Sequence, residues 1–179
     1  MISITPWIKR SFQFDFPIGL FPVIFSRLEG TIFRLHHLTV NADENYCSVS
    51  QNGWSIKQHI GHLTDLEELW WKRLRDFEQN KTVLTAADMD NKKTEIANYN
   101  KKPLHEIITE FSNERKRMLE KIHFFNAETL GKTALHLRLN IPMRMVDSLY
   151  FVAEHDDHHL AIISNLLRRD RLECVIFLF

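Results

Sequence analysis

Two histidines in the last third of the chain have a spacing that suits metal binding. His155 and His159 are the only histidines four residues apart. On an α-helix this spacing puts both side chains on one face, with Cβ atoms about 5–6 Å apart. Two imidazole nitrogens so placed can bind one divalent ion at about 2.0–2.1 Å each. The alternative is a pair of ordinary histidines, each satisfied by a backbone carbonyl or by water.

A divalent ion needs at least one further ligand, and the segment from Trp54 onward offers two candidates. His59 lies near the edge of the apolar stripe of the helix predicted there, and His62 lies further round the helix. Periodicity does not choose between them. Asp65 follows His62 by three residues, and metal-binding imidazoles usually donate their second N–H to a carboxylate or carbonyl. Asp65 is therefore a candidate for orienting a metal ligand, and the alternative is an aspartate without such a role.

Other chemistry finds less support in the sequence. The stretch around His155 is neither H-E-x-x-H nor H-x-x-E-H, so no glutamate is placed as a peptidase base. Cys47 has no features of a nucleophile. Arg138 and Arg144 lie near the start of the last predicted helix and could bind an anionic group of a substrate or thiol. The alternative for both arginines is an ordinary salt bridge.

Composition excludes several classes of partner. The 23 Lys and Arg residues balance the 23 Asp and Glu residues, so nothing indicates binding to nucleic acid or to an anionic membrane. No apolar run approaches the ~20 residues of a membrane span, and the first residues lack a secretion signal. The two cysteines are far apart and form no C-x-x-C. We expect a cytoplasmic protein with reduced thiols.

Apolar residues recur at three- and four-residue steps in four segments, which predicts four long helices. Their expected ranges are 17–38, 55–80, 103–122 and 142–168, and the first could start at Pro17 or at Pro22. Ser55 and Gln58 form a capping box at the start of the second helix. Residues 81–102 are predicted to be a connection with one short helical turn, and residues 123–141 to be a second linker.

These elements indicate an all-α protein with one domain over residues 1–179, a four-helix bundle with a crossover connection. Residues 1–16 are expected to form an irregular arm on the bundle, in preference to a paired strand. The apolar tail, residues 170–179, must be docked on this chain or on a second one. Because the last helix is also apolar on two sides, we expect a homodimer.

Two histidine motifs together resemble the DinB-like superfamily. They read Trp54-Ser-Ile-x-x-x-Ile-x-His62-Leu-x-Asp-x-Glu67 and, about ninety residues later, Asp147-x-x-x-Phe-Val-Ala-Glu-His155-Asp-Asp-His-His159-Leu-Ala-x-Ile163. Shorter stretches also resemble the family, including Arg27-Leu-Glu-Gly-Thr31 and His136-x-Arg-Leu-x-x-Pro-Met143. One departure is Leu137, where the family would have proline.

The resemblance implies an up-down-down-up bundle that binds one divalent metal, nickel or zinc. The implied ligands are His62, His155 and His159, with His59 and His158 as bystanders. Relatives include S-transferases that use a low-molecular-weight thiol, and many others are classed as metal-dependent hydrolases without a known substrate. The resemblance thus implies an enzyme acting on a small-molecule substrate.

A different class of function is open on the same residues. The chain could be a non-catalytic, dimeric binding or stress-response protein whose histidine site is structural or vacant. A closed metal shell with a fourth protein ligand would favour the structural role, and an open shell facing a cavity would favour catalysis.

Overall fold

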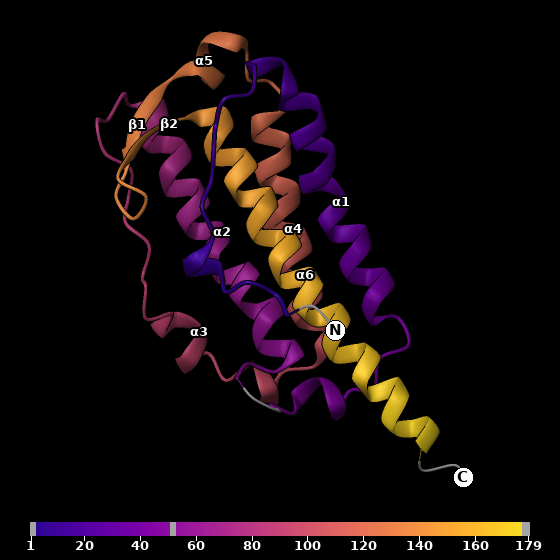
Figure 1. Ribbon diagram of the computed structural model, residues 1–179. Helices are drawn as coiled ribbons and strands as arrows, with labels where there is room; N and C mark the ends of the chain where they lie inside the picture. The colour runs from indigo at the N-terminus through magenta and orange to yellow at the C-terminus, as the bar shows by residue number, and fades with distance from the viewer. Residues whose placement is uncertain (1–2, 51–52, 177–179) are drawn as a thin grey trace.

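Four long helices form the bundle in the computed structural model, which describes residues 3–50 and 53–176, with side chains up to residue 168. They are α1 (Phe21–Thr39), α2 (Ile56–Glu78), α4 (Leu104–Ile122) and α6 (Met145–Ile176). Figure 1 shows that α1 and α6 run in one direction and that α2 and α4 run in the other. The predicted up-down-down-up bundle is confirmed.

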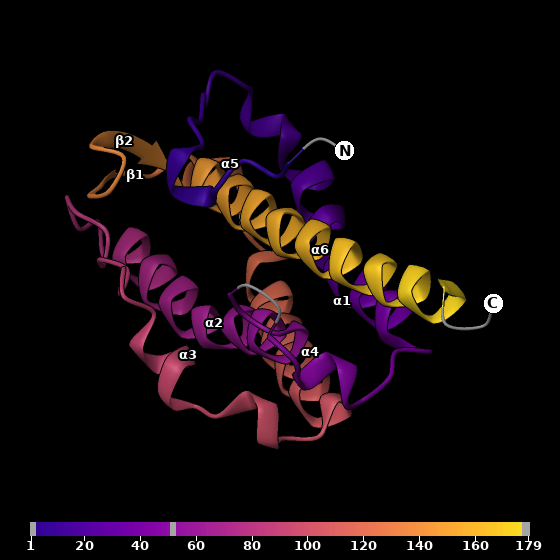
Figure 2. The ribbon, with the colours of Figure 1, turned by 60° about the horizontal axis from the view of Figure 1, so that its bottom comes forward.

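The packing of the helices sets which faces meet. Both α1 and α2 pack against α4 and α6, so α1 and α2 occupy opposite corners of the bundle. Figure 2 shows α6 lying over α1, with α2 beside α4. Each helix contributes fully buried apolar side chains to one core, among them Leu28, Ile60, Phe111 and Leu149. The face of α2 that meets α6 carries the histidines.

Local signals decide where the helices begin. The predicted capping box of α2 is present, because the Ser55 hydroxyl accepts the Gln58 N–H at 3.1 Å and the Gln58 side chain accepts the Ser55 N–H at 3.0 Å. Of the two prolines at which the first helix could start, the structure selects Pro22, because α1 begins at Phe21. A 3-10 turn, Ile18–Leu20, precedes α1, whose first turn contains Pro22. A proline is tolerated there because its missing N–H would have no helical partner.

The region before α6 differs from the prediction. The expected linker 123–141 contains a short helix, α5 (Ala127–Gly131), and strand β1 (Thr133–His136). Strand β1 pairs antiparallel with β2 (Ile141–Arg144), so Pro142 lies in a strand and does not start a helix. Pro142 lies opposite Leu135 of β1. The Leu135 N–H donates to the Thr82 carbonyl and the Leu135 carbonyl accepts the Leu84 N–H, so both groups bond away from β2. The pair therefore needs no N–H from the proline.

The crossover between α2 and α4 contains two short turns, where one was predicted. Helix α3 (Lys92–Ile96) and a 3-10 turn (Tyr99–Lys101) each follow an asparagine with positive φ, Asn91 and Asn98. Both turns contact α2. The crossover thus brings polar side chains against the histidine-bearing helix.

The N-terminal residues lie along α6 in Figure 1 and include one 3-10 turn, Trp7–Lys9. The Arg144 side chain anchors this arm through the carbonyls of Phe14, at 3.2 Å, and Phe16, at 2.9 Å. At the other end, the backbone of α6 continues to Ile176, and the docking of the predicted tail 170–179 falls outside the described side chains. Among the described helices, none combines the length and the apolar character of a membrane span.

Candidate functional site

The packing of α2 against α6 brings together the three predicted metal ligands. One nitrogen of each of His62, His155 and His159 lies within 4.8 Å of the others. All three side chains are buried, with 4–5% exposure. His155 and His159 face each other through their Nε2 atoms at 3.2 Å. Their spacing of one helical turn places them together, and the α2–α6 contact adds His62.

The three residues fit a divalent ion. Two nitrogens bound at about 2.1 Å to one tetrahedral ion would be about 3.4 Å apart, close to the 3.2 Å between His155 and His159. The Nδ1 atom of His155 is buried and has no hydrogen-bond partner among the described residues. Within that part of the chain, no fourth histidine, cysteine or carboxylate belongs to the group. The donor set is therefore open on one side.

Burial keeps these imidazoles neutral. It lowers the pKa of His62 to about 3. It also lowers the pKa of His155 and of His159 well below the ordinary value, helped by the charge that neighbouring histidines would carry. A metal binds the neutral imidazole. The site is thus ready for an ion at neutral pH without first losing protons.

A hydrogen-bond chain orients His62. The Thr94 hydroxyl donates to Asp65 at 2.9 Å, so it accepts the N–H of His62 Nδ1 at 3.2 Å. The Tyr99 hydroxyl donates to the second oxygen of Asp65 at 2.8 Å. His62 therefore keeps its Nε2 lone pair for an ion. Asp65 lies one hydrogen bond further from His62 than the sequence suggested, and Thr94, from the crossover, was not predicted.

His59 is outside the cluster, as the resemblance implied, but it contacts one of the predicted ligands. Its Nδ1 atom lies 2.9 Å from Nδ1 of His159. One of the two nitrogens must donate, and a proton on His159 Nδ1 would leave its Nε2 free for an ion. Burial lowers the pKa of His59 to about 4, so its ring is neutral and can accept. His158 makes no such contact, and its ring packs against Trp7 at 5.7 Å.

A cavity of about 290 Å³ opens beside the three histidines. Its walls are largely aromatic and aliphatic, with contributions from Trp7, Trp54, Trp70, Leu66, Leu69 and Phe151. Polar side chains outside the histidine cluster also line it, among them Arg73, His136 and Arg138. Arg144 does not. It forms an ion pair with Asp147 at 2.6 Å and holds the arm, so of the two predicted arginines only Arg138 reaches the cavity.

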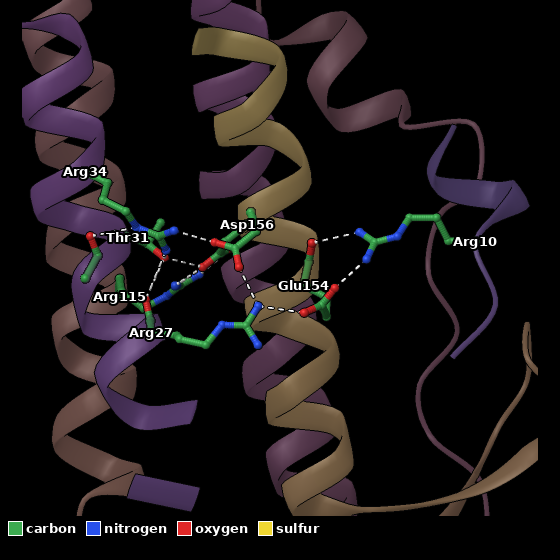
Figure 3. Close-up of polar contacts among 9 residues, drawn as sticks. Arg10, Arg27, Thr31, Arg34, Arg115, Glu154 and Asp156 are labelled. Carbon is green, nitrogen blue, oxygen red and sulfur yellow. Dashed lines mark hydrogen bonds and ion pairs between the residues drawn. The ribbon is translucent and has the colours of Figure 1, made fainter. Parts of the chain in front are cut away.

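A charged network behind the histidines fixes α6 in place (Figure 3). Arg115 of α4 is fully buried and pairs with both Glu67 of α2, at 2.6 Å, and Asp156 of α6. Thr31 of α1 also donates to Asp156, at 2.9 Å.

On the outer side of α6, Arg10 and Arg27 pair with Glu154, and Arg27 also pairs with Asp157. These contacts tie the helical turn that carries His155 to α1, α2, α4 and the arm. Sequence reasoning missed the network, because it links residues that are distant in the chain.

Comparison with known proteins places this fold and site in a family. The sequence profile of the DinB superfamily matches residues 27–163. A protein of Halalkalibacterium halodurans named "Putative metal-dependent hydrolase BH0277" is 28% identical over 144 residues, covering 77% of this chain and 81% of that protein.

A solved structure, YfiT from Bacillus subtilis, superimposes with a TM-score of 0.78 at 15% identity. The match covers 89% of this chain and 93% of YfiT, which is described as a probable metal-dependent hydrolase with an unusual four-helix bundle topology. At this identity the likeness establishes the fold alone. The profile match, which spans most of the chain including all three clustered histidines, establishes that this protein belongs to the DinB superfamily.

Proposed function

We propose that the protein is a metal-dependent hydrolase acting on a small molecule, with His62, His155 and His159 holding one nickel or zinc ion. The observation that carries the proposal is the open histidine cluster on the wall of the cavity. A structural site would be closed by a fourth protein ligand. A divalent ion in this donor set would supply Lewis-acid activation of water or of a thiol at neutral pH.

The chain's own residues have three tasks in this proposal. Thr94 holds the proton of His62 on Nδ1, and His59 does the same for His159. The indoles of Trp7, Trp54 and Trp70 line the cavity beside the cluster and would limit access of bulk water to it. The cavity volume of about 290 Å³ restricts the substrate to a small molecule.

Thiol transfer is the second candidate, and one feature of the cavity favours it. The only carboxylate among the described lining residues is Asp88, which is exposed and accepts the backbone N–H groups of Asp90 and Lys92. Among the described lining residues, a buried carboxylate that could act as a general base for water is therefore lacking. A low-molecular-weight thiol, whose free pKa is about 8.5, needs less help to ionise than water does.

Metal analysis of protein purified without an affinity tag tests the site. We expect about one nickel or zinc ion per chain in the natural protein and its loss in His155→Ala. His158→Ala is the matched control, since His158 lies next to the cluster without joining it, and should keep the ion. Full occupancy in His155→Ala would refute the ligand assignment.

A second experiment separates the two reactions. The metal-loaded protein is offered small esters, amides and alkylating electrophiles, each with and without a low-molecular-weight thiol. Turnover of esters or amides without thiol supports the hydrolase, and turnover of electrophiles that requires thiol supports the transferase. No turnover of either kind in protein that retains its metal would favour the non-catalytic, dimeric binding or stress-response protein.

The homodimer remains part of the proposal. In Figure 1 the C-terminal part of α6 extends beyond the ends of the other helices. The sequence from Cys174 to Phe179 is entirely apolar, and such a segment favours burial against a partner. Light scattering at micromolar concentration should give twice the chain mass of 21.3 kDa. A monomeric mass would contradict it.

A further inference from the structure

Three side chains that line the cavity each keep at least one N–H group without an acceptor among the described residues. They come from different elements: Arg73 from α2, His136 from β1 and Arg138 from the turn of the hairpin. None of the three belongs to the histidine cluster. Buried donors are nearly always paired in folded proteins, so unpaired ones need an explanation.

The guanidinium of Arg138 lies over two aromatic rings, and one of its terminal nitrogens has no acceptor among the described residues. The guanidinium stacks over Trp7, at 5.6 Å from the ring centroid, and over Phe151, at 5.4 Å. Stacking uses the faces of the guanidinium plane, whereas its hydrogen-bond donors point along the plane. The Nη2 atom is buried and has no partner among the described residues. The aromatic contacts therefore account for the position of Arg138 but leave its Nη2 without an acceptor in the described structure.

Arg73 is a buried cation without a counterion. Its side chain is almost wholly enclosed, at 4% exposure, and its Nε donates to the Thr85 carbonyl at 3.0 Å. No carboxylate in the described chain forms an ion pair with Arg73 or with Arg138. The acid that acts most strongly on it, Asp76, is already bound by Lys81 at 2.7 Å and by Thr85. The terminal nitrogens of Arg73 remain available to a ligand.

His136 supplies a third donor of known tautomer. Its Nδ1 accepts the Leu139 N–H at 3.2 Å, so the proton of the neutral ring is on Nε2. That Nε2 atom is buried and has no acceptor in the described structure. Burial and the nearby Arg73 and Arg138 charges lower the pKa of His136 to about 4, which keeps the ring neutral. It therefore presents one N–H to the cavity.

We propose that Arg73, His136 and Arg138 bind an oxyanion group of the substrate, a carboxylate or a phosphate. The site would thus take a small organic anion. A planar fork of guanidinium donors matches both groups, and an ionised acceptor is the strongest partner for buried donors. The aromatic walls would hold an apolar portion of the same molecule. The assignment deepens the proposed function and rests on it for the statement that the anion is a substrate.

The anion subsite and the histidine cluster line the same cavity. The centroid of the Phe151 ring lies 5.2 Å from that of His136 and 4.9 Å from that of Trp7. Trp7 in turn meets His155 edge-on at 4.9 Å. One aromatic layer therefore joins the two parts of the cavity. A ligand held at the arginines would extend along this layer toward the metal ligands.

Calorimetric titration with benzoate, phenyl phosphate and neutral benzamide tests the assignment. We expect at least one anion to bind and benzamide to bind at least tenfold more weakly. The preference between benzoate and phenyl phosphate decides which oxyanion the site is built for. Arg138→Gln should weaken anion binding roughly tenfold or more, which corresponds to about 1.4 kcal/mol, and Arg138→Lys should be intermediate. Arg117→Gln, at an exposed arginine, removes the same charge and should change nothing.

The same titration in His155→Ala separates this proposal from the metal-dependent function. We expect anion binding within about threefold of the natural protein, because the donors are distinct from the metal ligands. Equal binding of benzoate and benzamide would overturn the proposal. So would anion binding that is lost in His155→Ala but unaffected in Arg138→Gln, since the anion would then be a ligand of the metal itself. Metal content, measured separately, reports on the proposed function alone.

Discussion

His59 and His159 face each other through their Nδ1 atoms, 2.9 Å apart, although they lie a hundred residues apart in the chain. This contact turns His59 from a residue with no assigned role into the hydrogen-bond partner of a proposed metal ligand. Partners of this kind fix the tautomer and the ring orientation of the ligand.

His59→Phe should weaken metal affinity roughly 10–100-fold without abolishing binding, since a ring of similar size remains but the acceptor is lost. Competition with a chelator of known affinity measures the change. His158→Phe is the control, because His158 packs beside His159 without a hydrogen bond to it. Unchanged affinity in His59→Phe would show that the contact does not orient the ligand.

Thr94→Val should also weaken metal affinity, by about tenfold or more. The substitution keeps the shape of the side chain but removes the oxygen that accepts the His62 N–H. Tyr99→Phe is a graded comparison, because it removes one hydrogen bond to Asp65 and leaves the bond between Thr94 and Asp65 intact. A larger loss of metal affinity in Tyr99→Phe than in Thr94→Val would contradict the proposed order of hydrogen bonds, in which Thr94 contacts His62 directly and Tyr99 acts through Asp65.

Gly61→Ala should destabilise the protein although alanine favours helices. A Cβ atom at Gly61 would lie 2.3 Å from the Tyr99 ring, which Asp65 holds through a hydrogen bond. Overpacking of this kind typically costs about 1–3 kcal/mol. Gly30→Ala is the matched control on α1, where the nearest atom would be 4.0 Å away, and it should stabilise by up to about 1 kcal/mol. Urea unfolding measures both, and equal effects of the two changes would refute the close approach.

Arg115→Met should lower the free energy of unfolding by about 3–5 kcal/mol, because Glu67 and Asp156 would lose their shared buried counterion. Arg117→Met, two residues along α4 and exposed, should change it by less than about 0.5 kcal/mol. Chemical denaturation at pH 7 compares them. A loss below about 1 kcal/mol in Arg115→Met would mean that the ion pairs do not stabilise α6.

Glu67 should make stability depend on pH. Burial raises its pKa from 4.5 to about 7, which outweighs the opposing effect of Arg115. The folded protein therefore holds this proton more tightly than the unfolded chain does. The resulting stabilisation is complete below about pH 4.5 and is lost as the pH rises through about 7.

Glu67→Gln should remove this pH dependence. Between pH 5 and pH 8, the difference in unfolding free energy between the natural protein and the variant should therefore change by up to roughly 3 kcal/mol. Parallel curves of unfolding free energy against pH would contradict the raised pKa.

The sequence by itself determined the features that depend on neighbouring residues. The capping box of Ser55 and Gln58 needs only the first turn of α2. The juxtaposition of His155 and His159 needs only one turn of α6. Helix α4 follows from a proline and a regular apolar stripe, and its observed bounds, Leu104–Ile122, match the expected range. In each case the responsible interactions span a few residues, so local spacing records them.

Prediction from local spacing failed where one residue is compatible with both a helix and a strand. Pro142 is compatible with the first turn of a helix and with a strand position that needs no N–H. Only the pairing of β1 with β2, and of β1 with residues 82–84, selected the strand. A pairing between distant segments leaves no periodic trace in a stretch as short as four residues.

Only the tertiary structure decided how the site is completed. Periodicity could not choose between His59 and His62, and the rotation of α2 against α6 gives the two residues different roles. No role was predicted for Thr94 or Arg73, because one lies in a crossover and the other in a helix without a distinctive motif at that position. Their importance comes from distances across the bundle, which depend on how the helices pack and not on the order of residues within any one of them.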